Sequence, residues 1–179
     1  GTLDVMGAAI GHSLVVQIGF NRDIAWTHTV STGKRFTLFE LELAQDDARS
    51  YVLDGKAVPM IAQRVHYEVV DAQGVVQKRE HTVWQTQFGP VLEVPQAGLA
   101  WTRTRAYALK DANTLNLRAM DIWLGFNRDR SVGEMRTTLA KLGVPWVNTI
   151  AADRDGRAMY ADVSVVPDVD AAQLQRCAP

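Results

Sequence analysis

The hydrophobic and polar positions in the first half of the chain follow the period of two that is typical of β-strands. Leu41 and Leu43 fall on one face of an extended segment, and Glu40 and Glu42 fall on the other. This alternation predicts a strand over residues 36–43 with one mostly apolar face.

Other extended segments come in pairs that flank turn residues. Asp71–Gly74 separates two β-rich runs, and a glycine late in such a loop is typical of a hairpin. Tyr51–Gly55 is interpreted as a further tight turn. The predicted strand pairs are residues 15–20 with 24–30, residues 65–70 with 75–84, and residues 147–152 with 157–166.

The period changes after residue 113. Leu117, Met120 and Leu124 recur at helical spacing, which predicts a helix. Ser131 and Glu134 form a capping box that predicts the start of a second helix. Gly143 and Pro145 are expected to end it. The apolar stripe of the second helix is predicted to be Val132, Met135, Leu139 and Leu142.

The order of these elements is strands, then helices, then strands again. This order favours an α+β fold over a regular βαβ alternation. A length of 179 residues, with 47% hydrophobic and 22% charged residues, is suited to one domain with a sizeable core. We therefore interpret residues 1–179 as a single piece of one domain.

Charge and composition exclude several function classes. The formal net charge is -1 and no basic stripe is present, which argues against a nucleic-acid partner. The apolar runs are too short to cross a bilayer, so no membrane partner is expected. Cys177 is the single cysteine, which excludes an internal disulfide and a cysteine-based zinc site. Residues 1–7 lack the features of a signal peptide, and both ends are interpreted as cuts through a longer protein.

The residues alone offer only weak candidates for chemistry. His12 and Ser13 could belong to a loosely assembled Ser-His-Asp triad, but no nucleophile motif surrounds them. His28 lies in a predicted strand, where its ring is expected to hydrogen-bond a neighbour. Asp153–Gly156 looks calcium-like, yet it lacks further acidic ligands, so a plain β-turn is preferred. The five tryptophans are expected to be core or rim residues.

Several short strings resemble the penicillin acylase family, and within it the branch of acyl-homoserine-lactone and aculeacin acylases. Each string is weak by itself, but their order and spacing along the whole chain make the resemblance specific. The strings are Gly1–Ile10, Val15–Val30, Phe36–Phe39, Tyr51–Gly55, Tyr107–Asn113, Pro145–Thr149 and Ala151–Asp153.

The resemblance implies a piece of the large subunit of an N-terminal-nucleophile hydrolase with a four-layer αββα fold. In this family a precursor cleaves itself, and the new N-terminal Ser attacks with its own α-amino group as base. Gly1 is not that Ser, and the Ser and the following His are expected upstream. The Asn that completes the oxyanion hole is expected after Pro179. We therefore expect this chain alone to be inactive.

The resemblance also assigns site residues. The backbone N–H of Val30 is implied as an oxyanion donor. Ser31–Arg35 stands where penicillin G acylases carry acidic calcium ligands, so no metal and no cofactor is expected. The residues implied near the acyl pocket are Ile10, Ser13, Gln17, Thr29, Trp123 and Trp146.

The function implied is hydrolysis of the amide between a fatty acyl chain and an amine. Acyl-homoserine lactones are the leading substrates, followed by lipopeptides and penicillins. The alternative from another class is a non-catalytic binding or assembly module derived from the family. The implied partners are the small-molecule acyl amide, the small subunit and the rest of the large subunit from the same precursor. The implied location is periplasmic or secreted.

Overall fold

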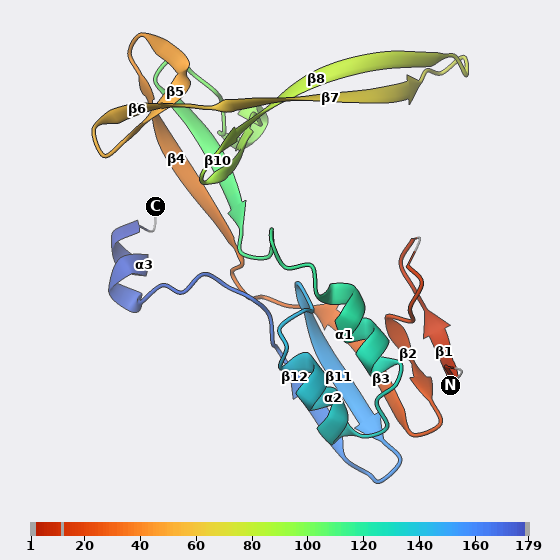
Figure 1. The fold of residues 1–179 in the computed structure, drawn as a ribbon. Coiled ribbons are helices and arrows are strands. Elements are labelled where there is room, and N and C mark those ends of the chain that lie inside the picture. The colour runs from red at the N-terminus through yellow and green to blue at the C-terminus, as the bar shows by residue number, and fades with distance from the viewer. Residues whose placement is uncertain (1–2, 12, 178–179) are drawn as a thin grey trace. The chain divides into compact units, whose positions relative to one another are not determined.

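The structure is a computed structural model that describes residues 3–11 and 13–177. The chain divides into two compact units, of which unit 1 comprises residues 1–35 and 112–179 and unit 2 comprises residues 36–111. Each unit has its own antiparallel sheet (Figure 1). Each unit also has its own hydrophobic cluster. Every residue that the sequence nominates for the site lies in unit 1.

The sheet of unit 1 has five strands in the order β1-β2-β3-β11-β12. All seven residues of β3 align with β11, whereas β2 pairs with β3 at only two positions. One long edge of β3 is therefore only partly covered by β2. The strands are β1 (Val5–Ala8), β2 (Ile18–Asn21), β3 (Ile24–Val30), β11 (Val147–Asp153) and β12 (Ala158–Ala161).

Two helices, α1 (Ala119–Phe126) and α2 (Val132–Leu139), cover one face of this sheet (Figure 1). The predicted capping residue is confirmed, because the Ser131 hydroxyl accepts a hydrogen bond from the Glu134 N–H at 3.2 Å. This bond satisfies one of the free amides of the first turn of α2. A third helix, α3 (Ala171–Cys177), follows later in the chain.

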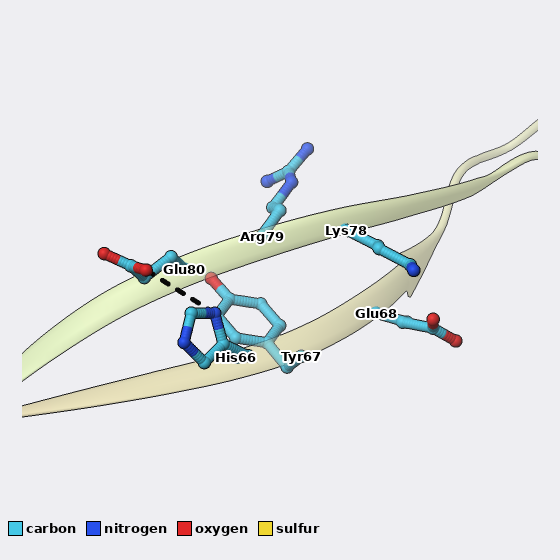
Figure 2. A pocket seen from close by; sticks show the side chains of 6 residues that line it. All are labelled: His66, Tyr67, Glu68, Lys78, Arg79 and Glu80. Carbon is cyan, nitrogen blue, oxygen red and sulfur yellow. Dashed lines mark ion pairs between the residues drawn. The ribbon is translucent and has the colours of Figure 1, made fainter.

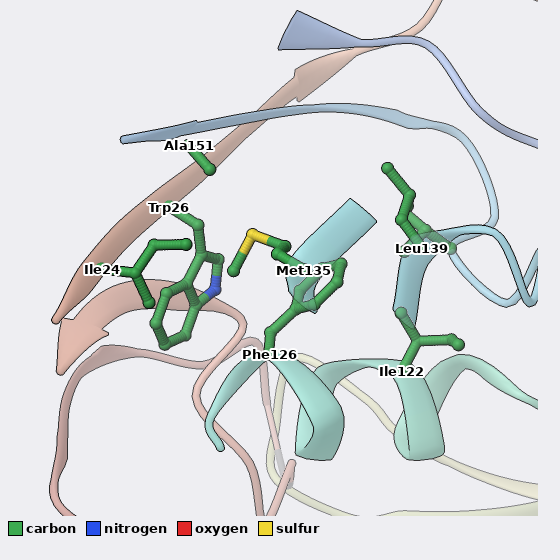
Figure 3. Packing of buried hydrophobic residues seen from close by; sticks show 8 residues of the cluster. Ile24, Trp26, Ile122, Phe126, Met135, Leu139 and Ala151 are labelled. Atoms are coloured by element: carbon green, nitrogen blue, oxygen red, sulfur yellow. The ribbon is translucent and has the colours of Figure 1, made fainter. Parts of the chain in front are cut away.

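The core of unit 1 lies between these two helices and the sheet, as Figure 3 shows. Ile24 and Trp26 contribute from β3, and they pack against Phe126 of α1 and Met135 of α2. Side chains alternate along a strand, so the same face of β3 also carries His28. This face is called the helix face below.

The opposite face of the same sheet, called the open face below, carries exposed apolar side chains. Met6 is paired with Phe20, and their exposed fractions are 68% and 51%. Ile18 and Tyr160, also on this face by register, are 41% and 67% exposed. No described element of unit 1 packs on this face as α1 and α2 do on the other.

Unit 2 is built on a seven-stranded sheet in the order β6-β5-β4-β10-β9-β8-β7. The predicted alternation is confirmed, because Leu41 and Leu43 are both 4% exposed in the core. The strands are β4 (Phe36–Ala44), β5 (Asp47–Leu53), β6 (Lys56–Pro59), β7 (Ile61–Val70), β8 (Val76–Thr86), β9 (Gly89–Leu92) and β10 (Arg105–Asp111), with a short 3-10 helix at Pro95–Ala97.

The hairpin of β7 and β8 is the predicted one, but its strands are longer than the sequence pattern indicated. Gly74 closes the turn at φ 81°, a conformation that side chains other than glycine rarely adopt. One face of the hairpin carries Val65 and Tyr67, while the other carries His66 and Glu80 in a cross-strand ion pair. Both faces carry polar side chains, because Val65 and Tyr67 lie opposite His81 and Arg79.

Four predictions about elements need correction. The first helix begins only at Ala119, so Leu117 precedes it and is 88% exposed, and its buried residues are Ile122 and Phe126. The second helix ends at Leu139, so Leu142 does not continue its stripe; it has φ 58° and is 41% exposed. The strand predicted over residues 15–20 begins only at Ile18, because Val16 bonds through its backbone N–H to the Asn127 side chain instead. The strand predicted over residues 157–166 is limited to β12.

The α+β class is confirmed by the sheets and helices of the described residues. The sequence patterns did not single out β9 and β10 as strands. Ala106 and Ala108 of β10 are fully buried, but alanine gives little signal of a strand. Only the pairing of β10 with β4 and β9 makes it a central strand.

Candidate functional site

Val30 is the last residue of β3 and lies opposite Val147 of β11. The next pair along the ladder is hydrogen-bonded, because the Ser31 N–H donates to the Trp146 carbonyl at 3.1 Å. Pairs alternate in an antiparallel ladder, so Val30 occupies a non-hydrogen-bonded position. Its own N–H therefore points away from β11.

The side to which the Val30 N–H points is the partly covered edge of β3. β2 pairs with this edge only at Trp26 and Ala25, which lie nearer the start of the strand. At Val30 no described strand continues the ladder, and the Val30 side chain is 76% exposed. A backbone N–H held at the end of a rigid strand can donate to an anion.

The side chain of Asn148 binds the backbone carbonyl of Val30. Its Nδ2 donates to the Val30 carbonyl at 3.2 Å and to the Thr29 hydroxyl at 3.2 Å. Asn148 is only 8% exposed, and its Oδ1 is buried without a hydrogen-bond partner among the described residues. The carbonyl of Val30 is thus occupied by a side-chain amide.

His28 anchors the backbone of Asn148 from the helix face. The Trp123 indole N–H donates to His28 Nε2 at 3.1 Å, and His28 Nδ1 lies 3.0 Å from the Asn148 carbonyl oxygen. An indole can only donate, so Nε2 accepts and Nδ1 carries the proton that is donated to Asn148. Burial lowers the pKa of His28, although the hydrogen bond to Asn148 opposes this shift. The prediction that this ring hydrogen-bonds its neighbours is confirmed.

The segment before β2 holds the first three residues nominated for the pocket. Gln17 Oε1 accepts from the backbone N–H of Ile10, and the Gln17 carbonyl accepts from the Trp26 indole at 2.8 Å. The Ser13 hydroxyl donates to the Val15 carbonyl at 3.1 Å, which is a local turn contact. His12, the other half of the candidate triad, lies outside the described residues. Gln17 thus ties this segment to the side of β3 that Val30 faces.

The two nominated tryptophans lie in different surroundings. Trp123 packs on His28 on the helix face, with ring centroids 6.3 Å apart. Trp146 precedes β11 by one residue and is 44% exposed, and the Arg35 guanidinium lies 4.4 Å from its ring centroid. By strand alternation Trp146 and Thr29 belong to the open face. The Val30 N–H lies in the plane of the sheet, between the two sets of side chains.

The turn predicted at Asp153–Gly156 is confirmed as a β-turn, because the Gly156 N–H donates to the Asp153 carbonyl at 3.1 Å. Gly156 has φ 84°, and Asp153 Oδ1 accepts from the N–H groups of Asp155 and Arg157. Asp153 Oδ2 accepts from the Val132 N–H at 3.0 Å, so the carboxylate also caps α2. These bonds, the one from Val132 foremost, lower the pKa of Asp153. Among the described residues, no three acidic, His or Cys side chains gather in a way that could hold a metal.

Within the described residues, hollows occur on unit 2, and the two described next are not lined by any residue predicted for the site. One, of about 540 Å³, lies on the β7–β8 hairpin beside the His66–Glu80 pair, as Figure 2 shows. The other, of about 470 Å³, lies beside Trp84 and Trp101. None of the helices in the described part of the chain is long and apolar enough to cross a membrane.

The sequence patterns did not nominate His28 and Asn148 for the site. A signal was present, because Asn148 is a polar amide that follows Trp146 and Val147 in the predicted strand 147–152. A buried amide at such a position must find hydrogen-bond partners. Which partners it finds depends on the register of β3 and β11.

A comparison of solved structures finds a thermostable penicillin G acylase from Alcaligenes faecalis. The match has a TM-score of 0.79 at 23% identity, and it covers 96% of this chain and 29% of that one. At this identity the likeness concerns the fold alone. It confirms that the α+β arrangement is one found in part of a penicillin acylase structure.

Sequence comparisons find longer bacterial relatives. The acyl-homoserine lactone acylase PvdQ of Pseudomonas putida is 46% identical over 178 residues, which are 99% of this chain and 23% of that protein. The aculeacin-A acylase of Actinoplanes utahensis is 41% identical over 180 residues, which are 100% of this chain and 22% of that protein. The chain therefore spans about a quarter of the length of these relatives. The family model for penicillin amidase matches residues 1–179, so the chain belongs to the penicillin amidase family.

Proposed function

We propose that this chain is part of an amide hydrolase that removes a fatty acyl chain from an amine, with N-acyl-homoserine lactones as the leading substrates. The observation that carries the proposal is the Val30 N–H, which points to the partly covered edge of β3. The relatives named acyl-homoserine lactone acylase support this substrate class.

In the proposed reaction the nucleophile is an N-terminal Ser outside residues 1–179. Its oxygen attacks the amide carbonyl carbon, and its α-amino group takes the hydroxyl proton and passes it to the leaving amine. The C–N bond breaks, and water then hydrolyses the acyl ester to the fatty acid. The Val30 N–H donates to the oxyanion that forms at each tetrahedral stage, together with an Asn outside this chain.

The acyl chain is proposed to lie beside Val30, between groups from both faces of the sheet. Trp123 would contribute from the helix face, and Trp146 and Thr29 from the open face. Apolar burial recognises such a chain at about 0.8 kcal/mol per CH₂ group, so large indole surfaces suit this role. Ile10, Ser13 and Gln17 would complete the neighbourhood from the segment before β2.

We further propose that residues 1–179 form a single piece of the large-subunit domain of a four-layer αββα hydrolase. The small subunit and the rest of the large subunit, from the same self-cleaving precursor, would be its partners. The apolar open face around Phe20 and Tyr160 supports a covering element, since soluble proteins rarely leave such faces bare. From the resemblance to the family we also propose a periplasmic or secreted location.

An acylase of lipopeptides is the second candidate, and the 41% identity to an aculeacin-A acylase favours it. A penicillin substrate is a further alternative within the same chemistry. A non-catalytic binding or assembly module derived from the family is the alternative from another class. Turnover by the complete protein separates that module from all three enzymes.

The experiment is to express the complete gene and compare Val30→Pro with Val30→Ala. Proline removes the N–H, whereas alanine keeps it. The Val30 N–H faces the edge of β3, so proline there deletes no bond to β11. We expect kcat on a long-chain acyl-homoserine lactone to fall by about 10²- to 10³-fold in Val30→Pro and to change little in Val30→Ala.

Residues 1–179 alone serve as the control and should release no fatty acid. Turnover by this chain alone, abolished by changing one of its own Ser residues, would overturn the assignment. An equal kcat for Val30→Pro and Val30→Ala, with matching melting temperatures, would remove Val30 from the site.

A further inference from the structure

The backbone C=O and N–H of Val30 have different surroundings in unit 1. The Val30 C=O is bound by Asn148 Nδ2 at 3.2 Å, and the N–H beside it faces the edge that no described strand covers. At Val30 the edge of β3 therefore presents the N–H as a donor, while the C=O already accepts a hydrogen bond from Asn148.

The location of Asn148 makes this contact rigid. Its backbone carbonyl receives the His28 Nδ1 proton at 3.0 Å, and His28 is in turn held by the Trp123 indole. Its side-chain amide is shared between the Thr29 hydroxyl and the Val30 carbonyl, on either side of the peptide that carries the Val30 N–H. Asn148 thus forms hydrogen bonds to groups on both sides of this peptide.

The arrangement has an electrostatic consequence for an anion at the edge. A free carbonyl beside the N–H would repel a developing oxyanion, and its peptide could rotate to seek water. A hydrogen bond from Nδ2 offsets part of the negative charge on the carbonyl and holds the Val30–Ser31 peptide, which adjoins the Thr29–Val30 peptide that carries the N–H. Preorganised donors of this kind stabilise a transition state because they need not reorient during the reaction.

We propose that Asn148 is a positioning residue for the oxyanion donor, acting through the Val30 peptide. The inference rests on the function proposed above and names a residue that this function does not itself require. A purely structural Asn would support the fold of unit 1 without a selective effect on the transition state. The two roles predict different kinetics.

The test uses the complete enzyme with Asn148→Leu, which is similar in size and lacks the donor. We expect kcat to fall by about tenfold to hundredfold with little change in KM, because the substrate ground state does not need the oxyanion donor. The affinity for an alkylboronic acid, which forms a tetrahedral anionic adduct with the nucleophile, should fall in parallel. The affinity for the free fatty acid should stay within about twofold of the wild type.

The matched control is Asn116→Leu, which removes side-chain bonds to the Leu142 carbonyl and to Asn113 in the same unit. It should lower the melting temperature without changing the ratio of boronate to fatty-acid affinity. A double variant adds a second criterion. In a Val30→Pro background, Asn148→Leu should lower kcat far less than it does alone, because the N–H donor that Asn148 is proposed to position is already absent.

The outcomes separate the two proposals. If the wild type turns over acyl amides but Asn148→Leu keeps its kcat, or loses boronate and fatty-acid affinity equally, the positioning role is overturned and the proposed function stands. If the losses of kcat caused by Asn148→Leu and Val30→Pro are fully additive in free energy, the positioning role is also overturned. If the wild type hydrolyses no acyl amide, both proposals fall together.

Discussion

The indole of Trp123 donates its N–H to Nε2 of His28 across 3.1 Å, and this one bond sets the protonation state of the histidine. Nε2 can accept only while it carries no proton. A protonated ring would face the Trp123 donor with a second donor. The neutral ring is therefore part of the fold of unit 1.

The first prediction concerns pH. Burial lowers the pKa of His28 below its usual 6.5, so the unfolded chain takes up a proton at a pH where the folded chain does not. The contribution of His28 to stability is complete above 6.5 and is lost as the pH falls from there towards the lowered pKa. Thermal melts of the complete enzyme should show this loss below neutral pH, and His28→Asn should reduce it.

Exposed histidines offer the control for this prediction. His66 is paired with Glu80 on the β7–β8 hairpin, and its side chain is 73% exposed. His66→Asn, at this exposed position, is the control substitution. An unchanged pH dependence in His28→Asn would refute the buried, neutral state.

The second prediction separates the two uses of Trp123. Trp123→Phe keeps an apolar ring but removes the N–H, whereas Trp123→Ala removes both. If the indole lines the acyl pocket, the alanine variant should lower kcat/KM for long chains more than for short ones, by roughly fourfold per CH₂ group that loses contact. The phenylalanine variant should lower kcat/KM by about the same factor for substrates of every chain length.

Trp146→Ala is the companion variant to this series. It removes an indole from the open-face side of Val30, where Arg35 covers the ring. A chain-length effect in both alanine variants would support a pocket that draws walls from both faces of the sheet. If both alanine variants lower kcat/KM equally for all chain lengths, the two tryptophans are packing residues that do not line the acyl pocket.

The third prediction concerns the carboxylate of Asp153, whose side chain is 1% exposed. It accepts from the Val132 N–H and from two N–H groups of its own turn. Asp153→Asn should lower the melting temperature of the complete enzyme by several degrees at neutral pH, because an amide group cannot accept all of these bonds. The lowered pKa means that this stability is lost only as the pH falls through that value.

Asp155, in the same turn, is the control for this substitution. Its side chain is 62% exposed and it pairs with Arg157 in solvent. Asp155→Asn should change the melting temperature little, because exposed ion pairs contribute little to stability. A similar drop in both variants would show that the cap on α2 is not the important contact.

The fourth prediction concerns Asp129, whose carboxyl is partly buried in the loop between α1 and α2. Its Oδ1 accepts from the Thr138 hydroxyl at 3.2 Å, and its Oδ2 is buried without a partner among the described residues. Burial raises the pKa of Asp129, so its charged form weakens the fold at neutral pH. Asp129→Asn should therefore raise the melting temperature there.

The gain from Asp129→Asn should disappear in acid. As the pH falls through the raised pKa, Asp129 itself becomes neutral and the wild type recovers the lost stability. Melts over a pH series check the sign. The same series on Asp168→Asn, an exposed position, is the control, and a gain for Asp129→Asn that grows in acid would contradict this explanation.

The fifth prediction concerns residues 1–179 expressed alone. The open face exposes Met6 and Phe20 by 68% and 51%, so the isolated chain should bind an apolar dye and aggregate. Dye fluorescence and light scattering measure both. A monomer that melts sharply and binds no dye would mean that this face needs no cover. Met6→Lys combined with Phe20→Lys should reduce dye binding if the face is the cause.

The sequence by itself determined the elements whose signal is local. The alternation around Leu41 and Leu43 predicted β4, the turn residues predicted the β7–β8 hairpin, and Ser131 with Glu134 predicted the start of α2. Period, turn chemistry and capping depend on neighbours within a few residues, so they can be read from the chain. The order of matching strings likewise sufficed for the family, which the comparison confirms.

Only the tertiary structure decided what surrounds Val30. The direction of its N–H follows from the register of β3 with β11, two segments more than a hundred residues apart in sequence. Its contact with Asn148 and the bond between His28 and Trp123 span similar separations. No local pattern encodes such pairings, because they arise when separate strands and helices pack and each buried polar group must find a partner.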